Sequence, residues 1–297
     1  MQLKSLFGLN IHDKRLEAAA EGLALDAVEG NDRQVYFVNA HCINLAADGG
    51  GYYSALKAAD TIFADGVGMK LAAMAAGDSL VDNVNGTDLF PLLCALAAQL
   101  GLKIAFLGAR PGVAQRCAEQ MIAAYPRLKI VYVRDGYFDR SGDAEVVRSI
   151  STSGAQILFV AMGVPNQELW LAEHAKQLNV PVKLGVGALF DFYSGSIPRA
   201  PLVLRKAGLE WLFRLALEPK RMFRRYVLGN PRFIARLVFL ALRGKEIVKN
   251  HQLSVHREPE KTFGRELAGF ATREESAGSN VDAEERPQQA NSSPHSQ

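Results

Sequence analysis

The chain has 297 residues, 48% of them hydrophobic and 22% charged, which is enough to form one large globular α/β domain or two small ones. No run approaches the roughly 18 apolar residues that a membrane-spanning helix needs, and charges interrupt residues 1–22, so we expect neither a spanning helix nor a secretory signal. The three cysteines, Cys42, Cys94 and Cys117, are typical of a reducing compartment rather than of a disulfide-stapled secreted protein.

Charge is distributed unevenly along the chain. Residues 1–196 carry 16 lysines and arginines against 20 acidic residues, whereas residues 197–245 carry 12 against 2, a net charge of +10. Residues 246–297 carry 6 against 9 and are rich in Glu, Ser, Gln and Pro. We therefore predict an α/β body, a basic helical appendage with an anionic partner, and a disordered tail, in that order.

Hydrophobic periodicity predicts the elements of the first hundred residues. In chain order they are a helix over Ile11–Val28, a strand over Gln34–Asn39, a helical stretch over His41–Ala59 interrupted at Gly49 to Gly51, a strand over Thr61–Ala64, a helix over Val67–Ala76, and a helix over Thr87–Leu100. Thr87 and Asp88 open the last helix, and Gly101 closes it.

The next hundred residues alternate regularly between strand and helix patterns. The predicted strands are Lys103–Leu107, Leu128–Val133, Gln156–Met162 and Val182–Val186, and the predicted helices are Val113–Tyr125, Asp143–Ser151 and Glu168–Leu178. Such alternation indicates βαβ units and a mostly parallel sheet, with the loops that carry function gathered at one rim.

After Gly195 the strand signals stop. Pro198, Pro201, Pro219 and Pro231 are expected to cut the appendage into short helices, because a proline removes a backbone donor and favours a first helical turn. We find no internal repeat.

Asp65 is the most informative carboxylate. It stands between a predicted strand and a predicted helix, at the strand end where open α/β sheets place their ligand crevice. A helix amino terminus favours the ionised carboxylate by a few tenths to about 1 kcal/mol, so Asp65 is fit to accept a proton at neutral pH. The alternative is that Asp65 is only an N-cap or turn residue.

The sequence FVAMGVPNQELW is the second informative stretch. Gly163 and Pro165 form a tight turn between strand and helix, and Gln167 lies in the first helical turn, where free backbone N–H groups can bind a diphosphate. The segment Gly108–Gly112 stands where a glycine-rich phosphate-binding turn would lie. The alternative is a capped turn whose Trp170 belongs to the core.

A third stretch runs from Gly185 to Pro201. Gly185 and Gly187 let the backbone approach a ligand closely, and Asp191 can accept hydrogen bonds from a base or a ribose. Arg199 stands between two prolines and is a further candidate. The alternative is a glycine-rich bend with packed aromatic side chains.

The appendage supplies the cationic candidates, which are Arg214, Arg221, Arg224 and Arg225, with Trp211, Phe213, Phe223 and Tyr226 among them. Arginine binds phosphate with two parallel hydrogen bonds, so the group suits a diphosphate and an anionic membrane surface. The segment Phe233–Leu242 has the composition of an interfacial helix. The alternatives are a solvated basic face and, more weakly, a nucleic-acid-binding surface.

Several common sites are missing from the sequence. It contains no phosphate-binding P-loop, G-x-G-x-x-G after a strand, H-E-x-x-H, paired C-x-x-C or D-x-D. We therefore predict that the protein uses no metal and no cofactor. Of the six histidines, only His41 is next to a candidate site, and a structural role is its alternative.

Eight motifs in fixed order resemble the WecG/TagA/CpsF family of bacterial glycosyltransferases, over roughly residues 1–245. They are NAHCINLA from Asn39, ADGVGM from Ala64, NGTDL from Asn85, FLGARPG from Phe106, GYF from Gly136, GVPNQE from Gly163, GVGALFDFYSG from Gly185, and RAP with GLEWLFRLALEPKRMFRRY. The resemblance implies a Rossmann-like α/β body with a helical, membrane-associating C-terminal appendage, the GT-E type of fold.

The resemblance also implies an activity, namely inverting transfer of a hexose or N-acetylhexosamine unit from a UDP-sugar to a polyprenyl-diphosphate-linked acceptor, on the cytoplasmic face of the membrane. It implies Asp65 as general base, with Gln167, Arg214, Arg221 and Arg224 in the active site. The motif residues predicted to bind substrate are Asn39, Gly66, Gly108, Tyr137, Gly163, Gly185, Gly187, Asp191 and Arg199.

Two positions depart from the family pattern. Many members have Thr where this chain has Phe37, and many have Arg near Asn83, so these roles are not transferred. The NAHCIN variant is similar to members that act on exopolysaccharides. The alternative function is a non-catalytic module that binds nucleotide-sugars and docks on membranes. Whether the chain forms a homo-oligomer stays open.

Overall fold

The structure is a computed structural model, and it describes residues 2–49 and 51–243. Its centre is a six-stranded sheet in the order β4-β3-β8-β7-β5-β6, and every neighbouring pair is parallel. The strands are β3 (Arg33–Val38), β4 (Thr61–Ala64), β5 (Lys103–Gly108), β6 (Lys129–Arg134), β7 (Ile157–Ala161) and β8 (Val182–Gly185). The prediction of a Rossmann-like, mostly parallel α/β body is confirmed.

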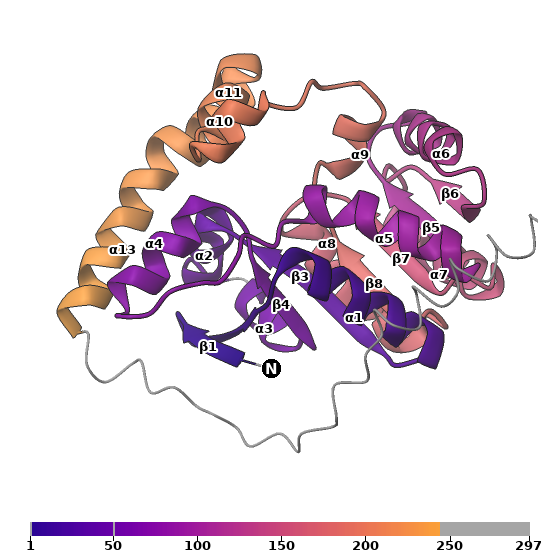
Figure 1. The fold of residues 1–297 in the computed structure, drawn as a ribbon, viewed down its shortest axis with the longest axis horizontal. Coiled ribbons are helices and arrows are strands. Elements are labelled where there is room, and N and C mark those ends of the chain that lie inside the picture. Colours follow the sequence, from indigo (N-terminus) through magenta and orange to yellow (C-terminus); the bar gives the residue numbers. More distant parts are fainter. Residues whose placement is uncertain (1, 50, 244–297) are drawn as a thin grey trace, which may run out of the picture. The chain divides into compact units, whose positions relative to one another are not determined.

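Helices cover both faces of this sheet, and each face has its own hydrophobic core (Figure 1). The helices of the body with residues in one core are α2 (Ala40–Ala47), α3 (Tyr52–Lys57), α4 (Val67–Ala75), α7 (Asp143–Thr152) and α8 (Asn166–His174). Those of the other core are α1 (Leu16–Glu29), α5 (Gly86–Leu100), α6 (Val113–Ala124) and α9 (Leu189–Tyr193). Two short 3-10 turns, Arg140–Gly142 and Ala175–Gln177, adjoin α7 and α8.

The chain begins with a β-hairpin that the sequence prediction missed. Strands β1 (Gln2–Leu6) and β2 (Leu9–Asp13) pair antiparallel through the two-residue loop Phe7-Gly8. Both loop residues have positive φ, 54° and 75°, as hairpin loops require. The predicted helix over Ile11–Val28 is therefore wrong at its start, because Leu9 and Ile11 are fully buried as strand residues and α1 begins only at Leu16.

Most other predicted elements agree with the structure. The strand Thr61–Ala64 is confirmed at both ends, and glycines with positive φ separate α2 from α3 as predicted. The helix α5 begins at Gly86, and its cap is the side chain of Asn85, which accepts a hydrogen bond from the backbone N–H of Asp88 at 2.8 Å. Thr87 thus lies inside the helix that it was expected to open.

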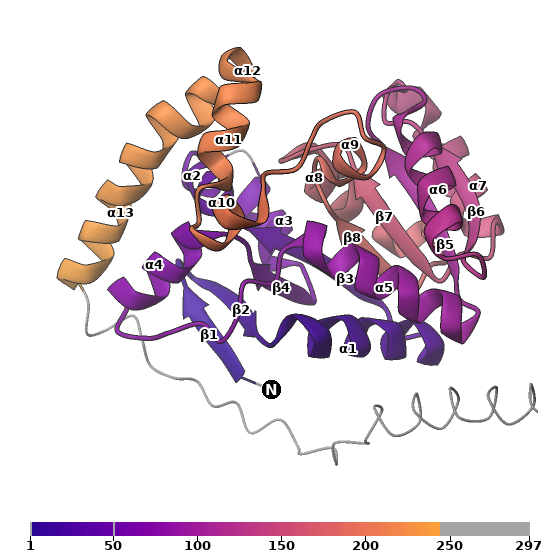
Figure 2. The ribbon, with the colours of Figure 1, turned by 45° about the horizontal axis from the view of Figure 1, so that its top comes forward.

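The basic appendage is helical, but Pro231 does not break it (Figure 2). Its elements are α10 (Leu202–Lys206), α11 (Glu210–Leu217), α12 (Pro219–Phe223), a π-helical turn (Arg224–Leu228) and α13 (Gly229–Arg243). In the π turn, the backbone N–H of Gly229 donates to the carbonyl of Arg224, five residues earlier. This wider turn precedes Pro231 and lets the helix continue although proline has no N–H.

Helix α13 packs on the body through α2 and α4. Asn44 in α2 donates its side-chain amide to the carbonyl of Gly229 at 2.8 Å and accepts from Arg236 at 3.1 Å. Phe233, Leu237 and Leu240 are buried in the same core as α2 and α4. The predicted disordered tail, residues 246–297, lies outside the described residues.

Candidate active site

A cavity of about 470 Å³ joins the carboxyl edge of the sheet to the appendage. The body contributes polar residues that follow β3 and β4 or precede α5, namely Asn39, His41, Asp65, Gly66, Asn83 and Asn85. The appendage contributes Glu210, Trp211, Arg214, Arg225 and Tyr226. Segments at least 125 residues apart in sequence therefore form one site.

Asp65 follows directly on the last residue of β4, as predicted. Its backbone N–H donates to the carbonyl of Val38 in the neighbouring strand at 2.9 Å, which fixes the start of the turn. The next residue, Gly66, has φ of 87° and donates its N–H to the side chain of Asn83 at 2.5 Å. A residue with a side chain would be strained at this φ, so Gly66 shapes the turn that presents the Asp65 carboxylate.

Among the described residues, the Asp65 carboxylate accepts one hydrogen bond, from the side-chain amide of Asn39 at 3.2 Å. Asn39 is itself fixed, because its side-chain oxygen caps α2 by accepting from the N–H groups of His41 and Cys42. Withdrawal from water raises the pKa of Asp65, while the bond from Asn39 and the charges of Arg225 and Arg214 oppose this shift. The net direction is opposite to that expected from the helix amino terminus alone.

Two arginines of the appendage face this carboxylate across the cavity. The Arg214 guanidinium lies 5.2 Å from the ring centroid of Phe192 and 3.9 Å from Glu218, and its side chain is largely buried. Arg225 lies 5.4 Å from the ring centroid of Tyr226. Within the described part of the chain, the Nε atoms of both arginines are buried without a hydrogen-bond partner. Both have unused hydrogen-bonding capacity toward a bound anion.

The other two predicted arginines lie elsewhere. Arg221 is exposed and pairs with Glu218 at 2.9 Å, and Arg224 is exposed as well. Neither lines the Asp65 cavity. The structure therefore places Arg214 and Arg225 beside Asp65, and not Arg221 or Arg224.

Glu210 and His41 line the cavity without having been predicted as site residues. Burial raises the pKa of Glu210, and the charge of Asp65 acts in the same direction. Burial lowers the pKa of His41 to about 4, so its imidazole is neutral at neutral pH. The sequence held a signal for Glu210, since the appendage has only two acidic residues and twelve lysines and arginines.

Arg199 holds the appendage to the body. It donates to Asp88 of α5 at 2.5 Å and lies 4.0 Å from Glu210. Arg205 reaches the same Asp88 oxygen at 3.5 Å. The ion pair with Asp88 therefore engages one nitrogen of a guanidinium that the sequence suggested for substrate binding, whereas the Nε atom of Arg199 is buried without a hydrogen-bond partner among the described residues.

Gln167 lies at the other half of the rim and is only 2% exposed. Its side-chain amide donates to the carboxyl group of Glu168 at 2.8 Å, and its side-chain oxygen accepts from the N–H of Gly187 at 2.8 Å. Both ends of the amide are thus used inside the protein. Gln167 fixes the loop after β8 against the start of α8.

The predicted glycines are placed by packing as much as by access to a ligand. A Cβ on Gly108 would lie 2.5 Å from the backbone of Ala161, and one on Gly185 would lie 3.1 Å from the Gln167 amide. Gly163 has φ of 79° and accepts at its carbonyl from the N–H of Gln167 at 3.0 Å. Close strand packing and turn geometry thus explain these positions without a ligand.

Asp191 and Tyr137 complete the predicted set. Asp191 is buried in α9, and burial raises its pKa, while the charges of Arg110 and Arg221 lower it. Tyr137 is 70% exposed after β6, in a turn that Asp135 caps. Neither lines the Asp65 cavity, so the predicted residues fall into two groups along the same rim.

Residues 4–247 match the sequence profile described as the Glycosyl transferase WecG/TagA/CpsF family. The chain belongs to this family. A relative from Bacillus spizizenii, named N-acetylglucosaminyldiphosphoundecaprenol N-acetyl-beta-D-mannosaminyltransferase, is 32% identical over 183 residues, which cover 62% of this chain and 70% of the relative. A protein of the same name from Bacillus subtilis is 30% identical over 183 residues, covering 61% and 70%.

The two positions at which this WecG/TagA/CpsF protein departs from the family pattern lie in different places, one in the core and one in the cavity wall. Phe37 is buried against Phe63, with ring centroids 5.9 Å apart, and lies outside the cavity wall. Asn83 lines the cavity and holds the Asp65 turn through Gly66. In residues 2–49 and 51–243, no helix is long and apolar enough to span a bilayer, and no group of three or more His, Cys, Asp or Glu side chains is arranged to hold a metal.

Proposed function

We propose that the protein is an inverting glycosyltransferase, which transfers a hexose or N-acetylhexosamine unit from a UDP-sugar to a polyprenyl-diphosphate-linked acceptor in the synthesis of a cell-surface glycan such as an exopolysaccharide. The name of the two relatives describes an N-acetylmannosaminyl transfer to a diphospho-undecaprenol sugar, which supports this acceptor class. The observation that carries the proposal is the cavity in which Asp65 meets two arginines of the appendage.

Asp65 acts as the general base. It takes the proton of the acceptor hydroxyl as that oxygen attacks the anomeric carbon, and the bond from that carbon to the UDP oxygen breaks on the opposite face of the sugar. The carboxylate is supported by Asn39 and partly withdrawn from water, which raises its pKa toward the operating pH. A base with such a pKa transfers protons more efficiently than a fully solvated aspartate.

In this scheme, cationic side chains rather than a metal ion stabilise the diphosphate of the departing UDP. Arg214 and Arg225 have buried Nε donors without a partner in the described residues, and they come from the segment with the largest positive charge. Positioned donors of this kind act where negative charge develops, in a site with little water. The start of α8, with Gln167 and the Gly187 loop, forms the support for the nucleotide at the other half of the rim.

The surface beside the cavity supports docking on the anionic inner face of the cell membrane. Helix α4 exposes Val67, Leu71 and Met74 at i, i+4 and i+7, and α13 exposes Ile234 and Val238. Lys70 and Lys206 line the Asp65 cavity at the same surface. Apolar side chains with interspersed cations are the composition of an interfacial membrane surface.

The test is release of UDP from UDP-sugars in the presence of a polyprenyl-diphosphate acceptor. We expect Asp65→Asn to lower kcat by about 10²- to 10⁴-fold while UDP binding persists, because only the proton acceptor is lost. The control is Asp60→Asn at the opposite end of β4, where an amide oxygen can still accept the N–H of Gln34. Wild-type activity in Asp65→Asn would refute the role of Asp65.

The pH profile gives a second readout. The reaction needs ionised Asp65, so kcat/KM falls as the pH drops through the raised pKa of this group, above the ordinary aspartate value of 3.8. A non-catalytic nucleotide-sugar-binding module would bind UDP-sugars and liposomes but release no UDP with any acceptor.

A further inference from the structure

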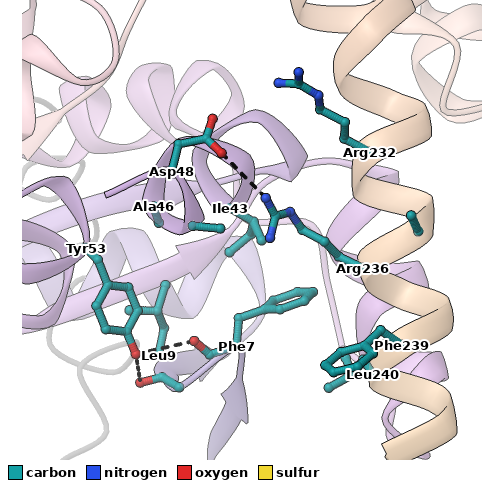
Figure 3. A pocket seen from close by; sticks show the side chains of 13 residues that line it. Phe7, Leu9, Ile43, Ala46, Asp48, Tyr53, Arg232, Arg236, Phe239 and Leu240 are labelled. Atoms are coloured by element: carbon teal, nitrogen blue, oxygen red, sulfur yellow. Dashed lines mark hydrogen bonds and ion pairs between the residues drawn. The ribbon is translucent and has the colours of Figure 1, made fainter. Parts of the chain in front are cut away.

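A second, larger cavity lies between the N-terminal hairpin, α2 and α13. Its volume is about 870 Å³. Figure 3 shows Phe7, Leu9 and Ile43 on the body side and Phe239 and Leu240 on α13. Among the described residues that line it, the only side-chain hydroxyl is that of Tyr53, which already donates toward the hairpin carbonyls of Phe7 and Gly8 at 3.4 and 3.3 Å. The walls therefore offer hydrocarbon contact and few polar partners.

This apolar cavity shares two walls with the Asp65 cavity. Helix α13 lines the Asp65 cavity with Phe233 and Ile234 and lines the apolar cavity with Ala235 and Arg236. Helix α2 is shared in the same way, through Ala40 on one side and Ile43 and Ala46 on the other. The rings of Phe7 and Phe233 lie between them, with centroids 6.0 Å apart. One aromatic pair thus separates a polar cavity from an apolar one.

The rim of the apolar cavity is cationic. Arg236 lies 3.6 Å from Asp48 and donates to Asn44 at 3.1 Å, so its position is fixed. Arg232, one helical turn earlier, is exposed and makes no ion pair with the described residues. Figure 3 shows its side chain above the Asp48–Arg236 pair, and the dashed line of the ion pair does not extend to it. Two guanidinium groups against one carboxylate leave net positive charge at this entrance.

We propose that the apolar cavity holds part of the polyprenyl chain of the acceptor, while the diphosphate and the reacting sugar occupy the adjoining Asp65 cavity. This inference rests on the proposed function. A hydrocarbon chain fits better than a peptide, because most of the lining inside the charged rim is apolar and would leave buried peptide N–H and C=O groups unpaired. A long isoprenoid gains its affinity from the apolar surface that it buries, and the cationic rim favours the anionic head of the same molecule.

Filling the apolar cavity with a large side chain distinguishes binding of the polyprenyl chain from binding of the acceptor head group. Ala46→Trp places an indole in the cavity from α2, and Ala235→Trp does so from α13, where the exposed position tolerates size. Ala123→Trp, on the exposed face of α6, is the matched control. UDP release is measured with two acceptors that carry the same diphosphate-linked sugar, one on a short alkyl chain and one on a long polyprenyl chain.

We expect both cavity variants to lower kcat/KM for the polyprenyl acceptor at least about tenfold and to leave the short-chain acceptor within about twofold. Equal losses with both acceptors, or no loss with either, would overturn the inference. Absence of wild-type UDP release with both acceptors would instead refute the proposed function.

Direct binding provides a readout without turnover. Native mass spectrometry of the wild type and Ala235→Trp, each mixed with polyprenyl phosphate or phosphatidylglycerol, is expected to show retention of polyprenyl phosphate by the wild type alone. Preferred retention of phosphatidylglycerol would assign the cavity to bilayer lipid and overturn the proposal. Equal retention of polyprenyl phosphate by the two proteins would place the chain elsewhere and overturn it as well.

Discussion

The two halves of the sheet's carboxyl edge use their polar groups in opposite ways. Beside β4, Asp65 accepts a single hydrogen bond, and Arg214 and Arg225 have buried nitrogens without partners among the described residues. Beside β8, both ends of the Gln167 amide are bonded within the protein. Buried polar groups are normally satisfied, so the unpaired arginine nitrogens of the first half suit an anionic ligand. In the second half the Gln167 amide is bonded to the protein, although Oε2 of Glu168 is also buried without a partner among the described residues.

Removing an arginine from the half beside β4, the open half, tests this comparison most strongly. We expect Arg214→Ala or Arg225→Ala to lower kcat by about 10²- to 10³-fold, the usual cost of losing one positioned donor to a developing charge. Arg214→Lys should restore only part of the activity, because lysine lacks the planar fork that binds phosphate at two points. Lys220→Ala, exposed in α12, removes the same charge and should stay within a few-fold of wild type.

The contrast would fail if Lys220→Ala were as damaging as Arg214→Ala in the same UDP-release assay. The net charge of the appendage, rather than two placed guanidinium groups, would then support turnover. Binding of UDP alone, measured by calorimetry, distinguishes a lost diphosphate contact from a misfolded appendage.

In the half beside β8, the closed half, we expect a substitution to change the stability of the protein rather than its catalytic activity. Burial raises the pKa of Glu168 from 4.5 to about 7. The folded state thus binds the proton more tightly than the unfolded chain, and this stabilisation is full below about pH 4.5 and lost as the pH rises through about 7. The pKa shift of Glu168 corresponds to a change of about 3 kcal/mol in the free energy of unfolding between the two pH limits.

Glu168→Gln keeps an oxygen for the Gln167 amide and removes the titration. In urea unfolding at pH 5 and pH 8, the variant should lose less stability than the wild type between the two pH values and should be the more stable protein at pH 8. A wild type that is equally stable at both values would show that Glu168 does not titrate in this range.

Local patterns predicted the body because its elements are set by short-range sequence. The strand Thr61–Ala64, the turn at Asp65 and the helix after it depend on apolar runs and one glycine, and the structure agrees with each of them. The hairpin escaped prediction because its turn is Phe7-Gly8 rather than a common Asn-Gly or Asp-Gly pair, so the usual signal for two paired strands was missing.

The arginines of the cavity could not be assigned by spacing. The π turn at Arg224–Leu228 adds a residue to one helical turn, which rotates the side chains by about 100° from the phase of a regular helix. Arg225 lies in the cavity wall and the adjacent Arg224 is exposed, as neighbouring helix residues point about 100° apart, and only the docked helix decides which of the two faces Asp65. Glu210 and Asn83 also needed the tertiary structure, since the docked appendage brings Glu210 to Asp65 and the fold of the body brings the Asn83 side chain to Gly66.

The smallest expected effect concerns the surface beside the open half. Met74 on α4 is 67% exposed near α13, and Ile122 on α6 is 41% exposed on the other side of the sheet. We expect Met74→Glu to weaken binding to liposomes with anionic lipids about fivefold, because a charge near such a surface changes the binding free energy by about 1 kcal/mol. Ile122→Glu should bind like the wild type. Equal weakening by both substitutions would mean that net charge alone governs binding, whereas a selective effect of Met74→Glu would place the mouth of the Asp65 cavity, and not the Gln167 side of the rim, against the lipid.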